Sequence, residues 1–179
     1  DAILAQHSGL IFSSDETEDS WKRLGNDGKV QLIIPEMLAE LAELADAPTS
    51  LTTSEFPYVL AAGERRDYTA NTIYRDDAWR RKDPQGALRI SPEDAAELGL
   101  ESGGRVKIST RTGTALTSVE VNARMMPGHV SLPNGFGLDN EDGGKSGVAP
   151  NDLTSLEDRD SFAGTPWHKY VAAQIEAVA

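Results

Sequence analysis

The 179-residue sequence contains no cysteine, so it can form no disulfide bond and offers no thiolate ligand to zinc or to an iron–sulfur cluster. It has only three histidines, His7, His129 and His168, and their wide spacing argues against a structural zinc site. No apolar run approaches the roughly 18 residues that a membrane-spanning helix requires. We therefore expect that the chain itself provides no metal ligands and has no membrane span.

Basic residues are scarce as well, because 17 lysines and arginines stand against 29 aspartates and glutamates, for a net charge of −12. This balance argues against nonspecific binding to nucleic acid or to an anionic membrane surface, which needs clustered cations. A few local cations could still bind an anionic small molecule. The chain starts at Asp1 with neither a methionine nor a signal segment, so we expect a piece of a longer polypeptide that resides in the cytoplasm.

The apolar residues fall into periodic blocks, and the length suffices for one sizeable core. Residues 1–30 are too polar to build a core of their own. The block IIPEMLAELAEL has apolar residues at helical spacing, with Pro35 and Glu36 suited to a first turn, and it predicts a helix at about 35–45. The small, polar stretch 45–55 predicts a linker. We expect a leader segment at 1–54 and one domain at 55–179.

Short strand patterns dominate that domain, and only one helix interrupts them. Ser91 as N-cap and Gly99 as terminator predict a helix between them. The expected strands are 56–62, 87–90, 106–110, 115–123, 129–132 and 170–175. Many short strands around a single helix favour a closed β structure.

The stretch HVSLPNGFG, residues 129–137, is the most informative of these patterns. Pro133 must stop the strand, while Asn134 and the two glycines permit a positive φ or a close approach to the backbone. Two interpretations are open from the residues alone: a strand ending in an Asn-Gly turn, or a strand that delivers a glycine-rich loop to a ligand.

Loops rich in Gly, Asn, Arg, Pro and Thr also occur at 63–75, 150–154 and 164–169. Arginine can bind phosphate through two hydrogen bonds, and asparagine can both donate hydrogen bonds to and accept them from the edge of a heteroaromatic ring. We expect these three loops and residues 133–137 to converge on a large polar ligand. We predict no catalytic residue, because the sequence has no acid–base pair, no nucleophile elbow and no GxGxxG motif.

Three blocks, RISPEDAAELGLESGGRVKISTRTG, VEVNARMMPGHVSLPNGFG and GVAPNDLT, closely resemble the molybdopterin dinucleotide-binding domain of the dimethyl-sulfoxide-reductase superfamily. That superfamily includes molybdenum and tungsten formate dehydrogenases and nitrate reductases. The resemblance covers about residues 56–178. It implies a mainly β fold with short helices, a double-psi β-barrel of the aspartate-decarboxylase-like type, preceded by a leader segment with one helix.

The resemblance also implies a cofactor, molybdopterin guanine dinucleotide with molybdenum or tungsten, bound by the parent enzyme and not needed for this domain to fold. The implied partners are the remaining domains of a formate-dehydrogenase-like oxidoreductase, since the family's metal ligand and iron–sulfur cysteines precede this domain. The domain alone would be inert, and formate is the favoured substrate of the parent.

Cofactor contacts carry over to loop positions that match the family's motifs. They are Gly63, Arg65, Arg66, Asn71, Thr72, His129, Pro133, Asn134, Gly135, Asn151, Asp152, Leu153, Gly164, Thr165, Pro166, His168 and Lys169. Glu64 interrupts the usual Gly-Arg-Arg, which leaves open whether Arg65 or Arg66 faces the cofactor. The alternative from another class is a double-psi-barrel interaction or adaptor module, as in the N-terminal domains of some AAA ATPases. An adaptor should expose an apolar groove away from loops 133–137 and 150–154.

Overall fold

The structure is a computed structural model that describes residues 32–47, 50–66, 82–139 and 144–178. Contacts within the chain divide it into two units, residues 1–48 and residues 49–179. The first unit contains helix α1 (Pro35–Glu43), which confirms the predicted helix and ends two residues earlier than expected. Pro35 occupies the first turn, and no residue of α1 is buried.

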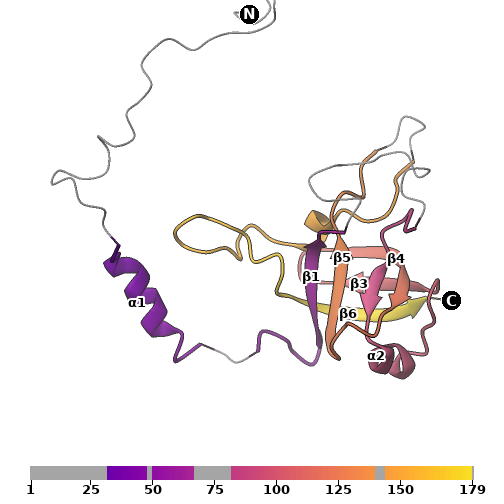
Figure 1. The fold of residues 1–179 in the computed structure, drawn as a ribbon, viewed down its shortest axis with the longest axis horizontal. Coiled ribbons are helices and arrows are strands. Elements are labelled where there is room, and N and C mark those ends of the chain that lie inside the picture. The colour runs from indigo at the N-terminus through magenta and orange to yellow at the C-terminus, as the bar shows by residue number, and fades with distance from the viewer. Residues whose placement is uncertain (1–31, 48–49, 67–81, 140–143, 179) are drawn as a thin grey trace, which may run out of the picture. The chain divides into compact units, whose positions relative to one another are not determined.

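The second unit is a closed barrel of six strands (Figure 1). Around the barrel the order is β1-β5-β2-β4-β3-β6. Its strands are β1 (Tyr58–Glu64), β2 (Leu88–Ile90), β3 (Arg105–Ser109), β4 (Thr114–Val121), β5 (His129–Pro133) and β6 (Val171–Val178). The neighbours β1–β5 and β2–β4 are parallel, and the other neighbours are antiparallel. The prediction of a mainly β fold with short helices and a closed barrel is confirmed.

Alternation along the strands fills the barrel interior. On β3, Val106 and Ile108 are fully buried, and Thr110, which continues the same face, is only 8% exposed. Leu60 on β1 and Leu132 on β5 are likewise fully buried. Each such side chain contributes about 1.5–3 kcal/mol by leaving water, so the alternation read from the sequence fixes which face of each strand turns inward.

Two short helices lie between strands in the chain: α2 (Pro92–Glu97) follows β2, and η3 (Pro150–Leu153) precedes β6. The N-cap prediction for α2 is confirmed, because Ser91 Oγ accepts a hydrogen bond of 3.0 Å from the Asp94 backbone N–H. Gly99 follows the helix with φ = +65°, as a left-handed terminator should. Strand β5 stops at Pro133 as predicted.

Candidate functional site

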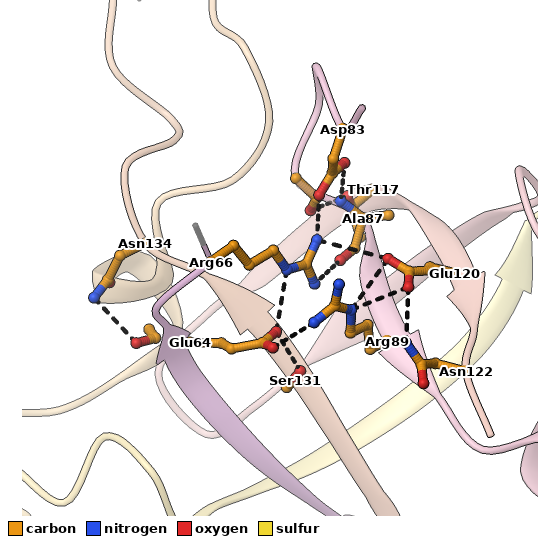
Figure 2. A network of polar contacts seen from close by, with 12 residues as sticks. Glu64, Arg66, Asp83, Ala87, Arg89, Thr117, Glu120, Asn122, Ser131 and Asn134 are labelled. Carbon is orange, nitrogen blue, oxygen red and sulfur yellow. Dashed lines mark hydrogen bonds and ion pairs between the residues drawn. The ribbon is translucent and has the colours of Figure 1, made fainter. Parts of the chain in front are cut away.

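Two of the predicted ligand loops meet where β1 and β5 end. A bulge at Gly63 shifts the β1–β5 register, and Gly63 has φ = +91°. Asn134 Nδ2 donates to the Gly63 carbonyl oxygen at 3.1 Å (Figure 2). The Asn134 backbone N–H donates to the Glu64 carbonyl oxygen at 2.9 Å. A Cβ on residue 63 would lie 2.8 Å from Asn134 Oδ1, so only glycine permits this close approach.

The third predicted ligand loop, residues 150–154, lies at the same end of the barrel, where η3 stands beside the end of β1 (Figure 1). Thr110 Oγ1, at the end of β3, donates to the Leu153 carbonyl oxygen at 2.9 Å and so fixes η3 against the barrel. Leu153 itself is fully buried in the core. Asn151 and Asp152, in contrast, are exposed, which leaves their amide and carboxylate able to contact a ligand.

The fourth predicted ligand loop, residues 164–169, is held by hydrogen bonds to the Asp160 carboxylate just before it. This carboxylate accepts hydrogen bonds of 2.6 Å from the backbone N–H groups of Ala163 and Thr165, and these bonds lower the pKa of the Asp160 carboxyl. The loop then returns to the barrel, because the His168 carbonyl oxygen accepts a hydrogen bond of 2.7 Å from the Ala62 N–H on β1. Lys169 is thereby held next to β1.

Behind these loops lies an ion-pair network centred on Arg66, which Figure 2 shows. Only 3% of the Arg66 side chain is exposed. Its guanidinium donates to the carboxylates of Glu64, at 3.1 Å, and of Asp83, and to the Ala87 carbonyl oxygen at 2.8 Å. Arg66 therefore joins the end of β1 to the segment that enters β2.

A second arginine, Arg89 on β2, extends this network across the sheet. It donates to Glu64 at 2.5 Å and to both carboxylate oxygens of Glu120 at 3.1 Å. Ser131 on β5 donates to Glu64 at 2.9 Å, so the Glu64 carboxylate accepts hydrogen bonds from Ser131 and from both arginines. Burial alone would raise the pKa of the Glu120 carboxyl, but hydrogen bonds from Asn122 and Arg89 and the nearby arginine charges lower it on balance.

A groove of about 390 Å³ runs along β1 and β5 outside the barrel. It unites three residues that the sequence predicts as cofactor contacts, Arg65, His129 and Lys169, and adds Arg124. Within the described part of the chain, Arg65, Arg124 and Lys169 have no ion-pair partner. Glu64 also lines the groove and pairs with the two arginines of the network, so three cations and one carboxylate line the groove. The groove is therefore locally cationic in an acidic chain.

A separate pocket of about 300 Å³ lies between the third and fourth loops. Thr154 and Trp167 line it together with Phe56 and Tyr170. The two loops thus face a common aromatic pocket, which could take the flat face of a ring. The sequence analysis did not single out this pocket, although three of the chain's eleven aromatic residues gather there.

The other predicted contacts are placed in different ways. Pro133 is buried and can offer only backbone to a ligand. Nδ1 of His129 lies 3.1 Å from the Pro127 carbonyl oxygen, and Nδ1 of His168 lies 2.9 Å from that of Pro166. Gly135 lies next to Asn134 with φ = +87°, and Gly164 is exposed on the fourth loop. Asn71 and Thr72 lie outside the described residues.

Within the described ranges, no three His, Asp or Glu side chains form a group that could hold a metal ion, and no helix is long and apolar enough to cross a membrane. The arrangement instead offers hydrogen-bonding loops, unpaired cations and an aromatic pocket. Such a set can bind and orient a polar anion that carries ring systems.

One family model and several known proteins are similar to this chain. Residues 58–172 match the family model of the molydopterin dinucleotide binding domain. Two Staphylococcus aureus proteins, each named "Putative formate dehydrogenase", are similar to the chain. The one from strain bovine RF122 / ET3-1 is 31% identical over 63% of this chain, and the one from strain USA300 is 30% identical over 62%. The chain spans only 11% of the length of either relative.

Among solved structures, acetylene hydratase from Pelobacter acetylenicus is similar in fold. Its TM-score is 0.61 at 22% sequence identity, and the match covers 89% of this chain and 23% of that chain.

Proposed function

Since the chain belongs to the molydopterin dinucleotide binding domain family, we propose that it binds the molybdopterin dinucleotide of a larger, formate-dehydrogenase-like oxidoreductase through its strand-end loops. The observation that carries the proposal is the contact between Gly63 and Asn134, because it brings two predicted loops together next to an exposed arginine, Arg65. A cofactor with phosphates and heteroaromatic rings requires cations and paired donors and acceptors, and both are present here.

The residues at this end of the barrel fit such a cofactor in distinct roles. Arg65 and Lys169 would hold its phosphates, because both line the cationic groove without a described acid partner. Asn134 and Asn151 would bind polar ring edges, and Gly135 would let the backbone come close. The remaining loop contacts proposed from the sequence are Asp152, Gly164, Thr165, Pro166 and His168.

Arg65 and Arg66 have different roles in this proposal: one contacts the cofactor, and the other positions the loop. Arg66 is buried, and its guanidinium is engaged by Glu64, Asp83 and the Ala87 carbonyl, so it would support the loop without touching the cofactor. Arg65 follows the bulge and points its exposed side chain to the groove. We therefore assign the cofactor contact to Arg65.

When bound, the cofactor, with molybdenum or tungsten, supplies the redox chemistry of the parent enzyme, for which we propose formate as substrate and the cytoplasm as location. The residues of this chain would bind the dinucleotide, fix its orientation and exclude water from it. No side chain of the domain would donate or accept a proton in the reaction. The domain's contribution is thus to position the cofactor within the assembled enzyme.

Amide hydrogen exchange of the full-length parent, with and without cofactor, tests this assignment. We expect cofactor to slow exchange in segments 63–66, 134–137 and 151–154, because bound loops open less often. Helix α2 has no predicted contact, so it serves as an internal control. If the cofactor slows amide exchange elsewhere in the parent but not in these three segments, the loop assignment is wrong.

A further inference from the structure

The groove along β1 and β5 has two chemically different ends. Because the strands are parallel, with Val59 opposite His129 and Glu64 opposite Pro133, Arg65 lies where β1 finishes and Arg124 lies where β5 starts. Four to five strand residues separate these ends, or roughly 15 Å at about 3.3 Å per residue. The ligand loops occupy the Arg65 end. Arg124, Met125, Met126 and Val59 form the other, which we call the methionine end, and His129, a predicted cofactor contact, stands beside it.

The methionine end carries apolar surface on a turn that is held rigidly. The Arg124 N–H donates to Asn122 Oδ1 at 3.0 Å, and the Gly128 N–H donates to the buried Asp94 carboxylate at 2.9 Å. Between these anchors, Met126 is 67% exposed. Because hydrogen bonds already fix the backbone of this turn, mainly the side chain of Met126 loses freedom when another surface covers it.

Its charge is also unusual for this molecule. The whole chain carries a net charge of −12, yet Arg124 meets no acidic side chain in the part of the chain that the structure describes. The cation stands beside two methionines, whose flexible thioethers adapt to differently shaped apolar partners. An acidic residue flanked by apolar ones would match both features.

We propose that the methionine end of the groove is a docking surface for an acidic, apolar segment of the remaining domains of the larger chain. The inference rests on the proposed function in one respect: this barrel must be part of a larger enzyme. The chain spans 11% of its relatives' length, so most of the polypeptide of such an enzyme lies outside it and has to pack against some face of the barrel. A carboxylate pairs with Arg124, and apolar side chains cover Met125 and Met126.

Site-specific photo-crosslinking in the full-length parent tests the proposal. A benzophenone amino acid at position 126 should capture one peptide from outside residues 1–179, and mass spectrometry should show acidic and apolar residues in it. The same probe at Leu116, which is 50% exposed on β4, serves as the matched control and should not capture that peptide. Arg124→Glu should reduce the yield at position 126 about tenfold, because the reversal removes an attraction and adds a repulsion of similar size.

The outcomes separate this inference from cofactor binding. The same preparations are assayed for pterin content. A cofactor-free preparation that still gives the crosslink supports docking and speaks only against the proposed function. A cofactor-loaded preparation with no crosslink at position 126, or with crosslinks only to residues 1–179 or to a small molecule, overturns the docking inference. A yield that Arg124→Glu leaves unchanged overturns the role of the charge.

Discussion

Replacing Arg66 with alanine should remove a large part of the barrel's stability. The side chain is 3% exposed and connects β1 to the segment entering β2 through Glu64, Asp83 and the Ala87 carbonyl oxygen. Alanine would leave the Asp83 carboxylate and the carbonyl oxygen without the donors they now have from Arg66, while Glu64 would keep only Arg89 and Ser131. The cost comes mainly from the acceptors left behind rather than from the ion pairs lost.

The expected magnitude follows from the burial of the pairs. Removing one partner of a buried ion pair costs about 3–5 kcal/mol, which is a large share of the roughly 5–15 kcal/mol that stabilises a typical domain. The matched control is Arg111→Ala. Its side chain is 75% exposed and pairs with Asp158 at 3.1 Å, and an exposed pair of this kind contributes about 0–1 kcal/mol.

Urea unfolding of the 179-residue chain, followed by circular dichroism, measures both variants. With a slope of about 2 kcal/mol per M, Arg66→Ala should lower the midpoint by roughly 1.5–2.5 M, and Arg111→Ala by less than about 0.5 M. Equal midpoints for the two variants would refute the reasoning, because they would mean that Arg66 acts like a solvated surface charge.

Two further predictions concern the loops. Gly63→Ala should lower the stability measured by urea unfolding more than Gly99→Ala does. Both glycines have a positive φ, but only a Cβ at residue 63 meets Asn134. Equal losses of stability would exclude the contact with Asn134 as the cause. The pKa of Asp160 is lowered in the folded state, so its carboxylate stabilises the fourth loop above the ordinary pKa of 3.8, and this contribution is lost as the pH falls through the lowered pKa. Amide exchange at Thr165 should accelerate over that interval, and a pH-independent protection factor would contradict the assignment.

Local patterns in the sequence predict the elements of this fold well. Ser91 and Gly99 bound α2, and Pro133 ends β5, because capping, left-handed termination and the missing proline donor act within a few residues. The alternation of Val106 and Ile108 likewise indicates the buried face of β3. Closure of the barrel could be expected from the number of short strands.

The details of the site depend on pairings that no local pattern contains. Arg65 and Arg66 are consecutive, yet Arg65 is exposed and Arg66 is buried, where it pairs with Asp83, 17 residues further along the chain. Arg124 enters the groove only because β1 and β5 pair in parallel, which joins segments about 70 residues apart. Composition marks such residues as candidates, but topology decides which of them meet.

The central claim, that this barrel binds a molybdopterin dinucleotide, is tested most directly by the cofactor content of the full-length parent. The double variant Asn151→Ala, Lys169→Ala removes one polar side chain from each of two loops, and Lys107→Ala on β3 removes a half-buried cation, paired with Glu176, away from them. The account predicts that metal and pterin content collapse in the double variant and stay at the wild-type level in Lys107→Ala. Unchanged metal and pterin content in the double variant would contradict it.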